Sequence, residues 1–335
     1  MTSIPRRRAL AFGASATLAL ALPAGTALAA DASTWPNQAV RIVVPYSPGG
    51  SADILSRELA QHLTNATGQS FIVDNRPGAS GWTGAQSVTR AAPDGYTLLL
   101  ATNGSHGLSQ LFSDNSPFDP FTDFTPITPA VMMPMALVVH PSVPATNAAE
   151  LVAWAKNEKQ AGEVTFGVPG IGSPHHLAGE NLNSYAEGRF AAIPYKGTGQ
   201  SITDVMGGHI PMVVGSLAAV LPHHREGRLR IIGMVENQRA DAAPDIPTVR
   251  ESLPDYVMPD TWMGYMGPAG MDPALTARIN ELLVTTLQKP EVQKSIGDLG
   301  LQVLTSSPDD FSQRMKDDVE VFKGMIKDRN IKTKP

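Results

Sequence analysis

Short runs of β-branched and aliphatic residues alternate along this chain with longer helix-like segments, and no other feature restricts its fold as much. The strand-like runs cover residues 39–46, 69–75, 96–102, 164–168, 190–195, 210–216 and 229–235. Such alternation predicts βαβ units and an α/β fold with mostly parallel sheets. Continuous apolar runs such as RIVV (41–44) and YTLLLA (96–101) indicate strands that are buried on both faces.

Two extended stretches interrupt the alternation, AVMMPMALVVHPS (130–142) and YVMPDTWMGYMGPAG (256–270). They are either edge strands or a pair of crossovers between two α/β lobes. In the crossover interpretation, one domain comprises residues 30–130 plus 256–335 and the other comprises residues 131–255. Roughly 300 mature residues exceed what a single core usually serves, which favours two domains.

The C-terminal region contains three helix-like segments, 273–288, 290–300 and 308–328. Each begins with proline, a residue favoured at the first position of a helix. We expect these helices to pack on the first lobe.

The first 29 residues have the pattern of an export signal. Arg6, Arg7 and Arg8 precede an apolar run over 9–22, and Ala27-Leu28-Ala29 forms a small-residue cleavage site. The arginine cluster is compatible with either the Sec or the twin-arginine route. No later stretch offers eighteen uninterrupted apolar residues, so we expect a soluble mature protein in the periplasm.

Composition argues against several classes of function. Removing the three signal arginines leaves 26 − 3 = 23 basic residues against 31 acidic ones, so the formal charge moves from −5 to −8. This acidity, with aromatic residues at only 6%, argues against a nucleic acid partner. The chain contains no cysteine, which excludes disulfides, thiol catalysis and zinc-thiolate sites.

The stretch VPYSPGGSADILSRELAQHL (44–63) combines a strand end, a glycine turn and a helix start. Gly49 and Gly50 allow a positive φ, and Ser51 can cap the helix that follows. The free N–H groups of a first helical turn favour an anion, but this stretch has neither the lysine of a Walker loop nor the G-x-G-x-x-G pattern. It is therefore either an anion cradle without a cation or an ordinary strand-to-helix turn. Asp53 either ties the loop or binds a donor on the ligand.

Three further strand ends repeat this arrangement. They are LLLATNGSHGLSQ (98–110), FGVPGIGSPHHLAGE (166–180) and AAIPYKGTGQSITDVMGG (191–208). Four such turns, two in each expected lobe, predict a cleft lined by helix starts and hydroxyl groups. Lys196 is the only cation among them, and it is either a counter-ion for the ligand or a solvated surface lysine.

Metal and hydrolase chemistry find little support in the sequence. The pairs His175-His176 and His223-His224 are adjacent, so neither has the i, i+4 spacing of a zinc-binding helix. We expect no metal and no cofactor. The nearest approach to a nucleophile elbow, residues 103–107 (NGSHG), lacks the first glycine of G-x-S-x-G.

Several ordered motifs resemble those of a known family. They are VPYSPGGSADILSR, DNRPGASGWTGAQSVTRAAPDGYTLLLAT, GSPHHLAGE, PYKGTGQSITDVMGGHI, APDIPTVRES and WMGYMGPAG. Over essentially the whole mature chain, this set resembles the tripartite tricarboxylate transporter receptor family, also called the Bug family of periplasmic solute-binding proteins. The resemblance implies a two-lobed, type II-like periplasmic binding protein fold without catalytic activity. It also implies closure on an organic carboxylate and delivery of that ligand to a membrane permease.

The resemblance also implies a set of ligand-binding positions. In the first lobe they are Tyr46, Ser47, Gly49, Gly50, Ser51, Asp53, Thr102, Asn103, Ser105 and His106, and in the second lobe Gly172, Ser173, His175, Tyr195, Lys196, Gly197 and Asp204. Trp82 stands where the family usually has a small amide side chain. We expect it either to favour a larger or aromatic acid or to pack under the loop.

The leading functional hypothesis is therefore a periplasmic receptor for an organic carboxylate, acting as a monomer with a permease of the tripartite tricarboxylate type. Two alternatives stay open at this point. One is an exported Ser/His hydrolase, and the other is a carboxylate sensor that signals its closed state to a partner protein.

Overall fold

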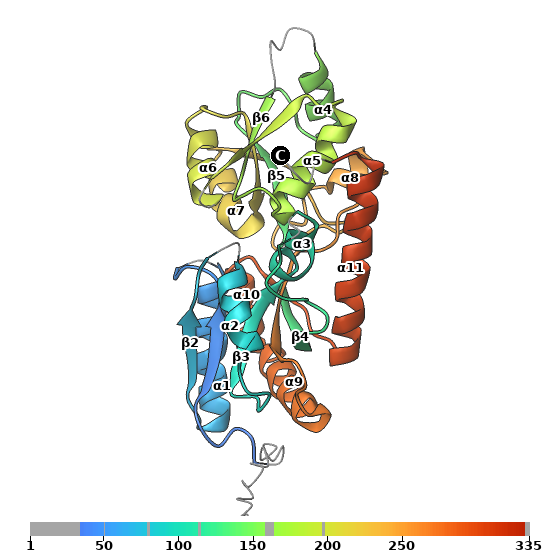
Figure 1. The fold of residues 1–335 in the computed structure, drawn as a ribbon. Helices are drawn as coiled ribbons and strands as arrows, with labels where there is room; N and C mark the ends of the chain where they lie inside the picture. The colour runs from blue at the N-terminus through green and yellow to red at the C-terminus, as the bar shows by residue number, and fades with distance from the viewer. Residues whose placement is uncertain are drawn as a thin grey trace, which may run out of the picture.

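Two α/β lobes, stacked end to end, make up the structure, which is a computed structural model (Figure 1). It describes residues 34–49, 51–78, 81–112, 115–157, 164–195 and 198–331. The expected export signal, residues 1–29, lies outside these ranges. We call the lobe with the six-stranded sheet the first lobe and the lobe with the five-stranded sheet the second lobe.

The first lobe is built on a sheet of order β11-β4-β10-β3-β1-β2. Its strands are β1 (Val40–Val44), β2 (Phe71–Asn75), β3 (Thr97–Thr102), β4 (Phe124–Met132), β10 (Trp262–Pro268) and β11 (Gln302–Val303). Its helical segments are α1 (Ser51–Thr67), α2 (Trp82–Thr89), the π-helical turn η2 (Gly104–Leu108), α3 (Ser109–Leu111), α9 (Pro273–Leu287), α10 (Pro290–Asp298) and α11 (Pro308–Asp328).

The second lobe is built on a sheet of order β7-β6-β8-β5-β9. Its strands are β5 (Met135–Val139), β6 (Val164–Val168), β7 (Phe190–Pro194), β8 (Met212–Ser216) and β9 (Arg230–Met234). Its helices are α4 (Ala148–Lys156), α5 (Pro174–Tyr185), α6 (Thr198–Met206), α7 (Leu217–Arg225) and α8 (Val249–Ser252). All seven strands expected from the sequence are present, each within its predicted run.

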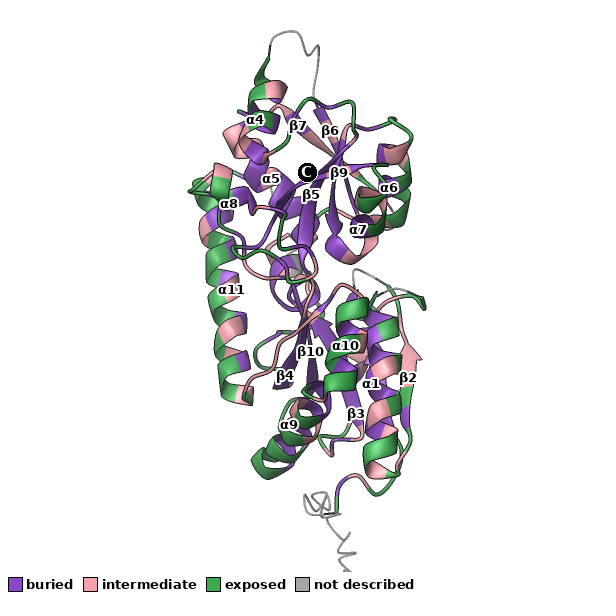
Figure 2. Ribbon diagram, turned by 180° about the vertical axis from the view of Figure 1, so that it is seen from behind, coloured by how far each residue is buried: buried purple, intermediate pink, exposed green. Residues whose placement is uncertain are grey.

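Alternating side chains place a core on each face of the first sheet. Ile42 packs with α1, α9 and α10, whereas its neighbour Val43 packs with α2 and α11 on the opposite face. The second sheet is covered in the same way, with α6 and α7 on one face and α4 and α5 on the other. The central strands are consequently buried, β8 along its whole length and β3 except at Thr102 (Figure 2).

The stretches 130–142 and 256–270 do not supply edge strands. β5 lies between β8 and β9, and β10 lies between β4 and β3. The chain leaves the first sheet after Met132 and enters the second at Met135, and it returns from β9 to β10. We propose the division at residues 130 and 256 that the sequence indicates.

The prediction of mostly parallel sheets was wrong, because both sheets are mixed. β1 pairs parallel with β2 and β3, and β6 pairs parallel with β7 and β8, as βαβ units require. However, β5 runs antiparallel to both its neighbours, and so does β10. Each of these strands enters its sheet from the other lobe, so its direction is set by the crossover rather than by a βαβ connection.

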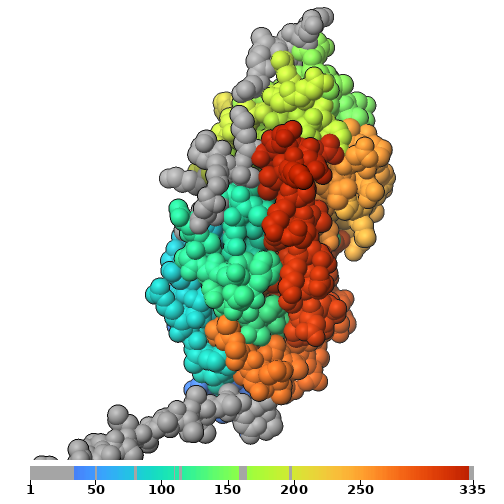
Figure 3. Space-filling model, turned by 45° about the vertical axis from the view of Figure 1, so that its right-hand side comes forward, coloured from blue at the N-terminus to red at the C-terminus, as the bar shows by residue number. Residues whose placement is uncertain are grey.

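Helix α11 corrects a second expectation, since it packs on both lobes rather than on the first alone. Phe311 and Met315 lie in a core of the first lobe, whereas Phe322 and Met325 lie in a core of the second. Its 21 residues give a length of about 31 Å, enough to run beside both lobes (Figures 1 and 3).

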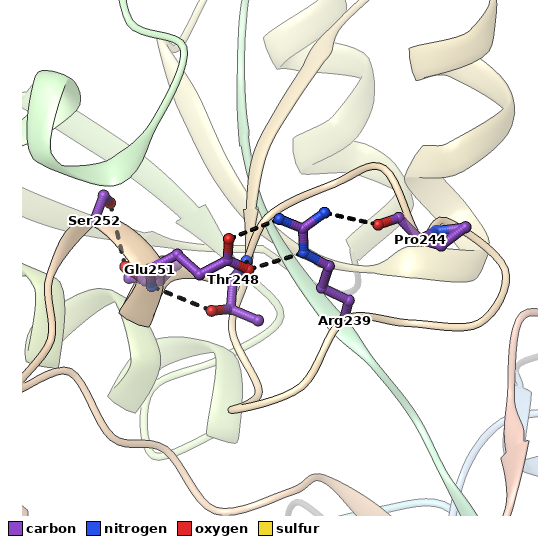
Figure 4. Close-up of polar contacts among 6 residues, drawn as sticks. Arg239, Pro244, Thr248, Glu251 and Ser252 are labelled. Carbon is purple, nitrogen blue, oxygen red and sulfur yellow. Dashed lines mark hydrogen bonds and ion pairs between the residues drawn. The ribbon is translucent and has the colours of Figure 1, made fainter.

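The connection between β9 and α8 is held by an ion pair (Figure 4). Arg239 Nε and Nη2 donate to the two carboxylate oxygens of Glu251 at 2.9 and 2.7 Å, and Arg239 Nη1 donates to the Pro244 carbonyl at 2.9 Å. Glu251 also completes a capping box with Thr248 at the start of α8. The loop is thereby fixed against the second lobe, away from the residues that line the cleft described below.

Candidate functional site

A cleft of about 1150 Å³ lies between the lobes, and both lobes supply its walls. In the first lobe the polar or turn residues that line it are Tyr46, Ser47, Pro48, Gly49, Ser51, Thr102, Asn103, Gly104, Thr261 and Asp298. In the second lobe they are Pro169, Gly170, Gly172, Ser173, His175, Thr198, Gly199 and Ser216. None of the described lining residues is lysine or arginine.

Helix starts from both lobes face this cleft. Ser51 and Ala52 open α1, Thr198 and Gly199 open α6, and Ser216 precedes α7. The first N–H groups of a helix have no partner within the helix and carry the positive end of its dipole. The helix starts thus present N–H donors and the positive ends of their dipoles to the cleft, whose described lining has no cationic side chain.

Helix α5 has the best defined of these starts. Ser173 Oγ accepts a hydrogen bond from His176 N at 3.1 Å and donates one to the Gly170 carbonyl at 2.7 Å. Pro174 occupies the first helical position, where its missing N–H costs nothing. The cap fixes the loop 170–173 against the helix, and Gly172 adopts a φ of +76° within it.

Asp53 ties the first loop from behind the cleft. Its Oδ2 accepts from Gly49 N at 2.9 Å, while its Oδ1 accepts from Asn75 Nδ2 and pairs with Arg57 Nη2, both at 2.9 Å. The hydrogen bond from Arg57, helped by those from Gly49 and Asn75, lowers the pKa of Asp53 to about 2. The carboxylate is buried and does not line the cleft, so its contacts are those of a residue that holds the glycine turn.

The loop after β3 divides into residues that line the cleft and residues that support it. Tyr46 and Thr102 share a hydrogen bond of 2.8 Å between their hydroxyl groups, and both line the cleft, as does Asn103. Ser105 and His106 lie behind them and are each 1% exposed. Burial lowers the pKa of His106 to about 3, so this imidazole is neutral.

In the second lobe, Gly172, Ser173 and His175 line the cleft. His175 is almost fully buried, and this burial lowers its pKa to about 4. Tyr195 donates to Asp204 at 2.7 Å, and neither residue is among those that line the cleft. Three predicted positions, Gly50, Lys196 and Gly197, lie outside the described residues.

The crossovers that connect the lobes are tied to each other and to the cleft. Met133 N donates to the Thr261 carbonyl at 2.7 Å, which joins the two chain segments. Asn103, a residue of the cleft, donates from Nδ2 to the Asp260 carbonyl at 2.9 Å. The Asp260 carboxylate pairs with Arg314 of α11 at 2.6 Å. Asp260 thus connects Asn103 to a crossover and to the helix that packs on both lobes.

A buried carboxylate lies beside the first crossover. Both oxygens of Glu236 accept from Met135 N, at 3.0 and 2.9 Å. Burial raises the pKa of Glu236 to about 8, against the lowering effect of its backbone hydrogen bonds, and the charge of Asp260 raises it further. Glu236 is thus largely protonated at neutral pH.

Much of the apolar lining of the cleft was not predicted from the sequence. It comprises Ala52, Ile54, Phe112, Met133, Ile171, Pro174, Ala218, Ala219, Met263, Leu299 and Leu301, and it adjoins the predicted Trp82. The methionine-rich stretches held a signal for Met133 and Met263, because a crossover between lobes passes the cleft. The start of α7 and the end of α10 carried no such signal.

The described residues offer little for catalysis. Ser105 Oγ lies 2.9 Å from His106 Nδ1, but both side chains are buried and neither lines the cleft. Among the described residues, no three His, Asp or Glu side chains are grouped so as to hold a metal ion. In the same part of the chain, no helix is both long and apolar enough to cross a bilayer.

Known proteins resemble this chain in sequence and in fold. The family model described as "Tripartite tricarboxylate transporter family receptor" matches residues 55–331. A UPF0065 protein of Bordetella bronchiseptica is 33% identical over 315 residues, covering 94% of this chain and 91% of that protein.

Two solved structures share the fold. One, described as R. palustris Rpa4515 with adipate, has a TM-score of 0.80 and 29% identity, covering 88% of this chain and 98% of the other. The other, MatC (Rpa3494) from Rhodopseudomonas palustris with bound malate, has a TM-score of 0.76 and 25% identity, covering 87% of this chain and all of the other.

Proposed function

The chain belongs to the tripartite tricarboxylate transporter receptor family, and we propose that it captures an organic carboxylate between its lobes and delivers it to a tripartite tricarboxylate-type permease. The family and its periplasmic binding protein relatives indicate a periplasmic location. One observation carries the proposal. The cleft is lined by helix starts from both lobes and, among its described residues, by no basic side chain.

The ligand carboxylate accepts hydrogen bonds from main-chain N–H groups and hydroxyl groups. The first-turn N–H groups of Ser51 and Ala52 in α1 supply the first-lobe side of this clamp, and that of His175 in α5 supplies the second-lobe side. Hydrogen bonds to a charged acceptor contribute about 1.5–3 kcal/mol each, so a few of them offset the loss of water around the carboxylate. Fixed dipoles need no reorganisation when the anion arrives, unlike flexible lysine side chains.

Closure follows from contacts to both lobes. A ligand shifts an open-to-closed equilibrium only as far as it binds the closed state more tightly, and contacts from a second lobe provide that difference. The crossovers at 133–134 and 258–261 act as the hinge, since the two lobes are joined there by single chain segments. Asn103 couples the ligand to this hinge through the Asp260 carbonyl.

The predicted site residues then take two roles. Those that contact the ligand are Tyr46, Ser47, Gly49, Ser51, Thr102, Asn103, Gly172, Ser173 and His175, with Trp82 at the side. Those that hold the loops are Asp53, Ser105, His106, Tyr195 and Asp204. Gly50, Lys196 and Gly197 continue the two loops and complete the proposed set.

Adipate and malate, the ligands of two relatives, are both organic carboxylates, which supports the proposed ligand class. Calorimetric titration of the purified mature protein with adipate, malate, citrate and benzoate tests the proposal. We expect binding of at least one acid, and a ligand at 100 times its Kd stabilises the fold by about 2.7 kcal/mol in thermal unfolding. Absence of binding across an extended carboxylate panel would overturn it.

Permease delivery is tested separately. Uptake of the bound acid into proteoliposomes that carry a permease of this type should require the receptor. Uptake at the same rate without the receptor would remove the transport part of the proposal. Hydrolysis of ester substrates that disappears in Ser105→Ala would instead support the hydrolase alternative.

A further inference from the structure

Two exposed isoleucines face the cleft from opposite lobes. Ile54, near the start of α1, is 42% exposed, and Ile171, in the loop before α5, is 55% exposed. Exposed side chains of this size leave apolar area in contact with water, which is unfavourable unless a partner covers it. Carboxylate binding by helix starts gives neither residue a role.

A larger set of apolar residues, mostly from the first lobe, lines the same cleft, and we call it the apolar wall. It consists of Trp82, Phe112, Met133, Met263, Leu299 and Leu301. Met263 and Leu301 are nearly fully buried, so the core of the lobe holds them in place. Phe112 packs on the second-lobe core and contacts the His176 ring of α5 at 5.7 Å between centroids, which places this part of the wall beside the carboxylate clamp.

The apolar wall itself offers no side chain with a strong hydrogen-bonding group other than the indole N–H of Trp82. Among the described residues that line the cleft, Asp298 alone is charged, and that carboxylate already pairs with Lys294 at 2.5 Å. Four of the lining hydroxyl groups lie at helix starts, those of Ser51, Ser173, Thr198 and Ser216, and four lie elsewhere, those of Tyr46, Ser47, Thr102 and Thr261. A ligand hydroxyl directed at the apolar wall would lose its hydrogen bonds to water without replacement, which is costly.

We propose that the preferred ligand is a carboxylic acid with an apolar alkyl or aromatic body, in preference to a hydroxylated acid of the same length and charge. This inference rests on the carboxylate-receptor function proposed above. The carboxylate lies at the helix starts and the body lies along the wall from Trp82 to Leu301. Lobe closure then brings Ile54 and Ile171 onto the body and removes both from water.

Carbon-matched and charge-matched pairs of acids test the proposal by calorimetry. Hexanoate is compared with gluconate, and adipate with galactarate. We expect each apolar acid to bind at least about tenfold more tightly than its hydroxylated partner. Along the series butanoate, hexanoate, octanoate, affinity should rise by about fourfold for each methylene that the wall covers.

Single substitutions test where the apolar body of the ligand lies in the cleft. Ile54→Ser and Ile171→Ser should each weaken hexanoate binding severalfold and should reduce the gain per methylene. Ile72→Ser is the matched control, because Ile72 is 53% exposed on β2 and does not line the cleft. All three residues are exposed, so the variants should keep the wild-type unfolding temperature.

Two results would overturn the inference in different ways. A flat alkanoate series, or tighter binding of gluconate and galactarate, would refute the apolar preference and leave the carboxylate receptor standing. Failure of every acid to bind would refute both. Wild-type affinity for hexanoate in Ile54→Ser and Ile171→Ser would refute the proposed place of the ligand body.

Discussion

Asp53→Asn tests whether the glycine turn of the first loop is held by a buried carboxylate. Asparagine keeps the shape of the side chain but has one acceptor oxygen instead of two. If the asparagine oxygen faces the donors of Asn75 and Arg57, its NH₂ group faces the N–H of Gly49. If the amide is flipped, its oxygen faces Gly49 and its NH₂ group faces the donors of Asn75 and Arg57. In either orientation, the hydrogen bonds on one side of the residue 53 side chain are lost.

The loss in free energy of unfolding can be worked out from the pKa of Asp53. Lowering the pKa of Asp53 from 3.8 to about 2 corresponds to roughly 2 kcal/mol of stabilisation by the charged form, at about 1.4 kcal/mol per unit. Counting each contact as a separate charged hydrogen bond would give a larger value, but the cost of burying the carboxylate offsets part of it. We therefore expect Asp53→Asn to lose about 2 kcal/mol at pH 7.

Urea unfolding at pH 7 measures this loss, and thermal unfolding should show a decrease of about 4–8 °C in Tm. Because the folded-state pKa is depressed, the contribution is present above about pH 4 and is lost as the pH falls through about 2. The variant should accordingly show a smaller loss of stability on acidification. Ligand affinity should also fall, since Gly49 is no longer held at its φ of +84°.

Glu58→Gln is the matched control, because Glu58 lies on the same helix, is partly exposed and contacts only His62 at 3.3 Å among the described residues. Its effect should stay within about 0.5 kcal/mol. Equal stability of Asp53→Asn and Glu58→Gln, with unchanged ligand affinity in both, would refute the loop-holding role of Asp53.

Three further predictions concern the hinge, the α5 cap and α11. Because the folded pKa of Glu236 is raised from 4.5 to about 8, the stability that its protonated form contributes falls as the pH rises from about 5 to 8. The buried histidines, whose pKa values are lowered, oppose this trend below about pH 6.5, so the fall in wild-type stability should be seen in urea unfolding between pH 7 and 8, and Glu236→Gln should remove most of it. An unchanged slope in that range would contradict the assignment. Ser173→Ala should lower the free energy of unfolding by about 1 kcal/mol and weaken carboxylate binding in calorimetry. Unchanged stability and unchanged affinity would show that the cap is dispensable. Phe322→Ala should destabilise the protein by about 3–5 kcal/mol and increase hydrogen exchange in the second lobe; exchange confined to α11 would contradict its packing on that lobe.

Much of the architecture could be predicted because short apolar runs and helix caps are local signals. Ser173 and Pro174 marked the start of α5 from sequence alone, and the seven strand runs all became strands. Strand direction in the crossovers was not predictable, since β5 and β10 depend on how the chain passes between lobes. The same holds for α11, whose apolar face continues past Met315 without indicating that its partners change from one lobe to the other.

The candidate site likewise has residues that could be predicted from the sequence and residues that could not. Turn residues such as Gly49, Ser51 and Gly172 could be located because glycines and caps at strand ends recur in the sequence. Which polar side chains face the cleft could not be predicted, because Asp53, Ser105 and Asp204 lie in the helical turns that follow these loops and have hydrogen-bond partners outside the cleft. The apolar wall needed the fold, since Phe112 and Leu301 come from segments 189 residues apart in the chain, 301 − 112.

The most direct test of the account is a comparison of adipate with its dimethyl ester by titration calorimetry on the purified mature protein. The two molecules share the same apolar body, and only the acid carries the charges that helix-start N–H groups are proposed to bind. The account predicts saturable binding of adipate, with the ester at least about a hundredfold weaker, a difference of about 2.7 kcal/mol. Equal affinity for the acid and the ester would contradict carboxylate recognition in this cleft.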